Sequence, residues 1–167
     1  MLSFEVHGPF KIPTERWKSG RIIPKDLSEF WETTELGDRC GVYIFAVRAG
    51  RGITPIYVGK ATRRFRGEAF ADHKRANHYS LALARYGRGT PVMFFVTWPE
   101  DRKPKLLMIK DLEDFLIQTG VARNPELSNI RGRGEKKWSI SGVVRSAGKR
   151  PSKAEQDFAA LMGLKKS

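Results

Sequence analysis

Short apolar runs separated by turn residues and helical patterns occupy the middle of the chain. The runs GVYIFAV at 41–47, TPIYVG at 54–59 and TPVMFFVTW at 90–98 are rich in β-branched and aromatic residues, which is typical of buried strands. RAGRG at 48–52 is turn material, so the first two runs predict a hairpin with a long tip.

Other segments carry apolar residues at helical spacing. They predict helices over about 27–36, over 61–86 with a break near residue 77, over 105–119 before Gly120, and from residue 153 to the end of FAALMGL. The last helix is preceded by Ser152 with Glu155 three residues later, which is a capping-box pattern.

The order of these elements predicts an α+β fold. We expect a small three-stranded antiparallel sheet flanked by helices, with the 105–119 helix packed on it. The 167 residues suit one domain. We expect a single domain over 1–167, with a helical N-terminal extension at 1–40, a core at 41–130 and a basic C-terminal extension at 131–167. WSISGVV in that last extension is a further candidate strand.

Charge points to a polyanionic partner. Lysine and arginine total 31 against 18 acidic residues, for a net charge of +13. Such a field attracts nucleic acids, and an anionic membrane surface is the weaker option. No stretch approaches the roughly 20 apolar residues of a membrane span. The N-terminus lacks a signal-peptide pattern, and the single Cys40 excludes an internal disulfide. We therefore expect a soluble cytoplasmic protein.

Glu113 is the most informative single residue of the predicted 105–119 helix. At about 100° per residue it falls inside the apolar arc, between Ile109 and Ile117. A carboxylate at that position must be paired, protonated or bound to a metal, because an isolated buried charge costs several kcal/mol. A structural salt bridge to one of the many arginines is the simplest of these interpretations.

Two tyrosines lie in the predicted hairpin strands. Strand alternation places Tyr43 with Phe45 on one face and Val42 with Ile44 on the other, while Tyr57 shares a face with Gly59. The two tyrosines can therefore project from the same side of the sheet. Core packing is the ordinary role of such residues, but Gly59 beside them indicates close approach by a ligand or another backbone.

Basic residues gather in two regions. The first follows Gly59 and the second is the segment 131–153, which holds eight cations and one acid. A charge run is usually a solvated face. The nucleic-acid contacts predicted from these regions are Lys60, Arg63, Arg64, His73, Lys74, Arg131, Arg133, Lys136 and Lys137.

Taken together, these features resemble the GIY-YIG nuclease family. GVY at 41–43 is similar to the first half of its signature, and YVG at 57–59, followed by Lys60 and Ala61, is similar to the second. A basic helix, a third strand and a glutamate-bearing helix with an asparagine after it follow in the family's order. The resemblance covers about residues 40–130, and it implies metal-dependent cleavage of a DNA phosphodiester bond.

The resemblance also implies a role for individual residues. Tyr43 resembles the tyrosine that activates or positions the attacking water, and Tyr57 the one that hydrogen-bonds near the scissile phosphate. Arg66 resembles the arginine that stabilises charge on the phosphate, with Arg63 and Arg64 as alternatives. Glu113 resembles the sole protein ligand of one Mg²⁺ or Mn²⁺, and Asn129 the asparagine that braces the site.

The sequence thus predicts a divalent-metal-dependent DNA endonuclease. The alternative is a nucleic-acid-binding module that has lost catalysis, and a weaker third interpretation is an interaction protein whose charge only keeps it soluble. RNA stays open as a partner, a membrane is not expected, and the oligomeric state is not determined by the sequence.

Overall fold

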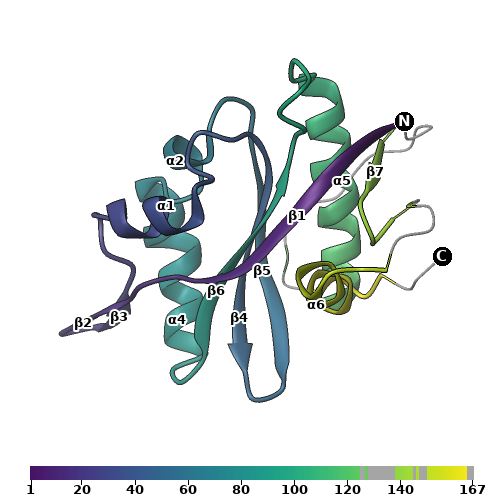
Figure 1. The fold of residues 1–167 in the computed structure, drawn as a ribbon. Helices are drawn as coiled ribbons and strands as arrows, with labels where there is room; N and C mark the ends of the chain where they lie inside the picture. Colours follow the sequence, from purple (N-terminus) through teal and green to yellow (C-terminus); the bar gives the residue numbers. More distant parts are fainter. Residues whose placement is uncertain (125–126, 128–137, 145, 147–149, 165–167) are drawn as a thin grey trace.

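A strongly curled five-stranded sheet forms the centre of the computed structural model (Figure 1). The structure describes residues 1–124, 127, 138–144, 146 and 150–164. The strand order is β5-β4-β6-β1-β7, with bounds β1 Leu2–Lys11, β4 Gly41–Ala49, β5 Gly52–Ala61, β6 Thr90–Thr97 and β7 Trp138–Ile140. All neighbouring pairs are antiparallel except β1 and β7, which are parallel. The sheet is therefore mixed.

The predicted fold class is wrong in the size and type of the sheet. The three predicted strands are present, with β4 antiparallel to both β5 and β6, but β1 and β7 extend the sheet beyond them. Leu2, Phe4 and Val6 alternate with polar residues, as a half-buried strand requires, and they join the core. Gly8-Pro9 interrupts this alternation, and the register shift between His7 and Phe10 accommodates the pair.

The N-terminal 40 residues are accordingly not a helical extension. After β1 they form a small antiparallel hairpin, β2 Glu15–Trp17 and β3 Gly20–Ile22, and only then the helix α1 Ser28–Thr34. The central hairpin also differs from its prediction. Its strands β4 and β5 continue to Ala49 and Gly52, so its tip is short rather than long.

Helices cover the two faces of the sheet. On one face lie α1, α2 Phe65–Glu68, α3 Asp72–Lys74, the π-helix η1 Arg75–Tyr79 and α4 Ser80–Arg85. On the other lie α5 Leu106–Arg123 and α6 Lys153–Met162 (Figure 1). The predicted break near residue 77 is wrong, because the backbone coils without interruption from Asp72 to Arg85 and breaks earlier, between α2 and α3.

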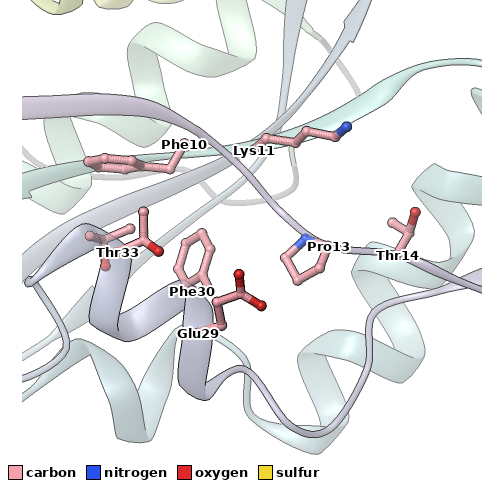
Figure 2. A pocket seen from close by; sticks show the side chains of 8 residues that line it. Phe10, Lys11, Pro13, Thr14, Glu29, Phe30 and Thr33 are labelled. Carbon is pink, nitrogen blue, oxygen red and sulfur yellow. The ribbon is translucent and has the colours of Figure 1, made fainter.

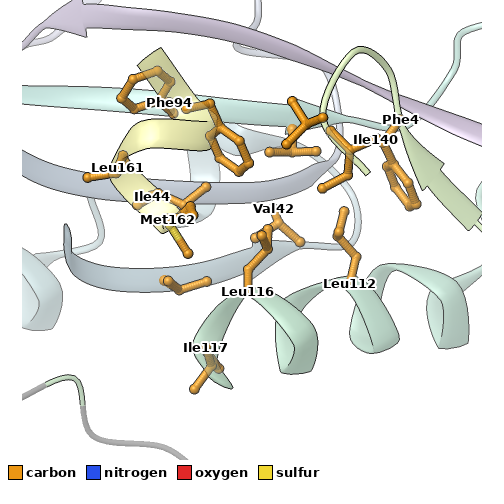
Figure 3. Close-up of a cluster of buried hydrophobic side chains, with 14 of the residues drawn as sticks. Phe4, Val42, Ile44, Phe94, Leu112, Leu116, Ile117, Ile140, Leu161 and Met162 are labelled. Carbon is orange, nitrogen blue, oxygen red and sulfur yellow. The ribbon is translucent and has the colours of Figure 1, made fainter. Parts of the chain in front are cut away.

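Alternation along β4 divides the core into two clusters. Val42 and Ile44 pack with Phe94 against Leu112 and Leu116 of α5 (Figure 3). Tyr43 and Phe45 face the opposite cluster, with α1 to α4. This is the facing that the sequence predicted.

Two helix ends show what local signals determine. The Ser152–Glu155 capping box is present and begins α6, as predicted. Helix α5 instead continues past Gly120 to Arg123. A Cβ on Gly120 would lie 2.8 Å from Leu127 Cδ1, so this glycine serves close packing rather than helix termination. Among the residues that the structure describes, no helix is long and apolar enough to cross a membrane.

Candidate functional site

The two predicted tyrosines meet in a cleft of about 280 Å³ beside the edge strand β5. We call it the tyrosine cleft, and it is lined by Tyr43, Tyr57, Gly59, Lys60, Thr62, Glu68, Lys74 and Glu113. Apart from Thr62, which directly follows β5, these residues come from β4, β5, α2, α3 and α5, so helices from both faces of the sheet contribute to the cleft. The cleft brings together groups that are up to 70 residues apart in the chain.

Gly59 allows the two rings to approach each other. Tyr43 on β4 is paired with Gly59 on β5, and the Tyr43 and Tyr57 rings stack with centroids 6.3 Å apart at 24°. A Cβ on Gly59 would lie 2.5 Å from Tyr43 Cζ and 2.8 Å from Tyr57 Cε1. Both distances are too short for a side chain, so Gly59 is needed for this packing.

Lys74 lies at the buried end of the cleft, with only 7% of its side chain exposed. Its ammonium group donates hydrogen bonds to the Tyr43 hydroxyl at 2.6 Å and to the Glu68 carbonyl oxygen at 2.8 Å. It also pairs with the Glu68 carboxylate at 3.2 Å. These contacts compensate its burial and fix the Tyr43 hydroxyl in one place.

Glu113 reaches the same cleft from α5. Its side chain is 13% exposed and its Oε2 accepts a hydrogen bond from Lys60 Nζ at 2.5 Å. The carboxylate is therefore paired, which is the simplest of the three interpretations that the sequence offered. Its partner is Lys60 of strand β5, a lysine rather than the arginine that the sequence suggested.

The tyrosine hydroxyls are held in the protonated form. Burial raises the pKa of Tyr43 well above its ordinary value, and the nearby Tyr57, Glu68 and Glu113 add to the shift. Burial, with the Glu113 carboxylate second, also raises the pKa of Tyr57. At neutral pH the more exposed Tyr57 hydroxyl can therefore orient a water or a phosphate by hydrogen bonding, and neither hydroxyl is ionised to act as a base. Tyr57 is half-buried and Tyr43 fully buried, so Tyr57 is the more open to solvent.

Arg66 does not line the cleft. Its guanidinium packs on Gly37 and lies 3.8 Å from the Asp38 carboxylate. Arg63 and Arg64 are exposed in the turn before α2 and do not line it either, and His73 is exposed on α3. The cations of the cleft are instead Lys60 and Lys74.

The remaining predicted residues are outside the part of the chain that the structure describes. They are Asn129, Arg131, Arg133, Lys136 and Lys137. Glu68 and Thr62, which line the cleft, were missed from the sequence. Glu68 comes from a four-residue helix that no periodicity marks, and Lys74 approaches it across the break between α2 and α3.

The oxygen donors of the cleft suit a hard cation. Glu113 and Glu68 supply carboxylates and Thr62 a hydroxyl, which are the donor types that Mg²⁺ and Mn²⁺ prefer. The ammonium of Lys60 donates a hydrogen bond to Glu113 Oε2. Lys60 would have to share this oxygen with a bound cation or move away from it. Within the described residues, no three His, Cys, Asp or Glu side chains are grouped to hold a metal. An ion there would keep most of its water shell.

A second pocket, of about 540 Å³, lies between α1 and the end of β1 (Figure 2). Glu29, Phe30 and Thr33 of α1 line one side, and Phe10, Lys11 and Pro13 line the other. It contains one carboxylate and one ammonium but no tyrosine, histidine or cysteine. The tyrosine cleft therefore offers the richer set of chemical groups.

Comparison of the chain with known proteins found no matching family model, no matching curated protein and no matching solved structure.

Proposed function

We propose that the protein is a metal-dependent endonuclease that cleaves DNA phosphodiester bonds in the tyrosine cleft. The observation that carries this proposal is the stacked tyrosine pair over Gly59, in one cleft with the Glu113 carboxylate and two lysines. The same residues carry the resemblance to GIY-YIG nucleases. The net charge of +13 supports a polyanionic substrate.

The groups of the cleft have complementary roles in this proposal. The Tyr57 hydroxyl donates a hydrogen bond to a phosphate oxygen. The Tyr43 ring, whose hydroxyl accepts a hydrogen bond from Lys74, stacks on the Tyr57 ring and holds it in position. Lys60 provides positive charge where negative charge develops on the phosphate. Glu113 and Glu68 are the groups that would hold Mg²⁺ or Mn²⁺, which when bound would act as a Lewis acid.

A second candidate function is a nucleic-acid-binding module without catalysis. The observation in its favour is the close Lys60–Glu113 pair, which occupies the carboxylate oxygen that a metal would use. Arg66 also favours this function, because its side chain packs on Gly37 and does not line the cleft in which it would stabilise charge on a phosphate.

Incubation with supercoiled plasmid and Mg²⁺, Mn²⁺ or EDTA distinguishes the two functions. We expect nicking with either metal and none with EDTA. Glu113→Gln, which keeps the side-chain size, is expected to abolish nicking, to weaken Mn²⁺ binding and to preserve the circular dichroism spectrum. Lys110→Gln, an exposed change on the same helix, is the matched control. A wild-type protein that binds plasmid but never nicks it would favour the binding module, and nicking by Glu113→Gln would remove Glu113 from the mechanism.

A further inference from the structure

The β2–β3 hairpin projects from the molecule beyond α1 and α4 (Figure 1). Its strands pair Glu15 with Ile22, Arg16 with Arg21 and Trp17 with Gly20. Trp17 is 65% exposed although it is a large aromatic residue. An exposed tryptophan on a short protruding hairpin contributes little to any core, so its ring is available to an external partner.

The base of the hairpin is fixed to the end of α4. Arg21 donates hydrogen bonds to the carbonyl oxygens of Gly89 at 2.7 Å and Tyr86 at 2.9 Å. Tyr86 is the C-terminal capping residue of α4. These bonds between a charged side chain and two carbonyls outside the hairpin hold it in place, so that its tip is presented to a ligand in a defined orientation.

A groove of about 590 Å³ runs between the hairpin and α4. We call it the hairpin groove. Its hairpin side includes Arg16, Trp17, Lys18 and Arg21, and its α4 side includes Leu83 and Ala84. It is lined by three cationic side chains and by no carboxylate, and the segment 73–89 that contains α4 has no aspartate or glutamate at all. The groove is therefore complementary to a negatively charged ligand.

We propose that the hairpin groove binds single-stranded DNA, with a base stacked on Trp17 and the neighbouring phosphates held by Arg16 and Lys18. An aromatic ring together with a cationic groove is the combination that binds single strands without reading their sequence. A duplex offers no free base face to the ring, because its bases are already stacked on each other. A purely apolar partner would not benefit from the three cationic side chains that line the groove.

This inference rests on the proposed function only for the choice of DNA as the polyanion. The hairpin groove and the tyrosine cleft share no lining residue. Binding can be measured in EDTA, where no cleavage is expected. A wild-type protein that cleaves DNA but does not bind single-stranded DNA in the hairpin groove would refute this inference alone. A wild-type protein that binds single-stranded DNA there but never cleaves DNA would refute the endonuclease proposal alone.

Tryptophan fluorescence reports directly on this site. Trp31, Trp98 and Trp138 are buried, so Trp17 is the exposed one of the four tryptophans. Titration of the protein with an oligothymidylate in EDTA is expected to quench the solvent-exposed part of the emission and to protect it from acrylamide. The same titration of Trp17→Ala should give little change. Equal quenching in the two proteins would overturn the proposal.

Affinities measured with a labelled oligothymidylate test the contacts separately. Stacking of one base predicts that Trp17→Ala weakens binding by about 5- to 150-fold and that Trp17→Phe retains most of it. Arg16→Ala combined with Lys18→Ala should lower the salt dependence of the binding constant by about 1.4 log units per log unit of salt.

Leu107→Ala is the control, since it removes another exposed apolar side chain from α5, outside the hairpin groove. Unchanged affinity in Trp17→Ala, or an equal loss in Leu107→Ala, would refute the stacking contact. Quenching of the Trp17 emission by a blunt duplex as strong as that by the single strand would also refute it.

Discussion

Replacement of Gly59 by alanine tests the geometry of the tyrosine cleft most directly. The added methyl group would lie 2.5 Å from Tyr43 Cζ and 2.8 Å from Tyr57 Cε1. Carbon atoms normally rest about 3.5–4.0 Å apart. The Tyr43 ring must therefore move by about 1 Å or more.

The surroundings leave little room for that movement. Tyr43 is fully buried, packs edge-on against Phe65 and accepts a hydrogen bond from Lys74. Overpacking of such a site costs about 1–3 kcal/mol. For a protein of this size each kcal/mol lowers the melting temperature by about 2–4 °C. We therefore expect Gly59→Ala to melt about 2–12 °C below the wild type.

Displacement of the ring should also affect cleavage. A misplacement of about 1 Å in a catalytic group can cost about 100-fold in rate. The assays are thermal melting by circular dichroism and plasmid nicking at a temperature where both proteins are folded. Nicking by Gly59→Ala is expected to fall by a similar factor.

Gly52→Ala is the matched control in the same strand. A Cβ at Gly52 would meet only the Ala49 carbonyl oxygen, at 4.0 Å, which is an ordinary contact. This variant should melt and cleave as the wild type does. If Gly59→Ala melts within about 1 °C of Gly52→Ala, the packing of Tyr43 against Gly59 is not as the structure has it.

Three further predictions concern Lys74, the buried tyrosines and the basic C-terminal extension. Lys74→Met keeps the side-chain volume but removes the donor to the Tyr43 hydroxyl and the Glu68 carbonyl. It should lower the free energy of unfolding, measured in urea, by about 1–3 kcal/mol and should reduce nicking, and a variant as stable as the wild type would contradict this. Because the pKa values of Tyr43, Tyr57 and Tyr79 are raised in the folded state, the stability that they confer is present below about pH 10 and lost as the pH rises above it. An absorbance titration should show these three tyrosines ionising only as the protein unfolds, and ionisation of all four tyrosines of the folded chain near pH 10 would refute the shift. Alanine at Arg131, Arg133, Lys136 and Lys137 should lower the slope of log binding constant for duplex DNA against log salt by about two or more units, with little change in cleavage at saturating protein; identical slopes would mean that these residues do not touch the phosphates.

The local patterns of the sequence predicted the central strands and their facing. The alternation along 41–47 placed Tyr43 and Val42 on opposite faces, and each is found in the expected cluster. The capping box at Ser152 marked the start of α6. These features depend on residues close together in the chain, so a short window of sequence contains all of their information.

The number of strands was decided by contacts between the ends of the chain. Strand β1 enters the sheet by pairing with β6, about 90 residues away, and β7 pairs with β1 across about 135 residues. The sequence did mark WSISGVV, which contains β7, as a candidate strand, but it gave no sign that β7 would pair with β1. Strand β1 was not predicted, because Gly8-Pro9 interrupts its alternation. Their pairing is stabilised by burial against the rest of the fold, which no local window contains.

The candidate site shows the same division. The sequence by itself determined that Tyr57 and Gly59 would share one face of their strand, since strand periodicity fixes it, and it allowed Tyr43 to project from the same side. It also determined that Glu113 would need a partner, since its helix position is apolar. Only the tertiary structure decided that the partner is Lys60, that Lys74 and not Arg66 supplies the buried cation, and that Glu68 joins them. The physical reason is that a long charged side chain can reach several groups of opposite charge. The folded arrangement of distant elements determines which of these groups lies within hydrogen-bond distance.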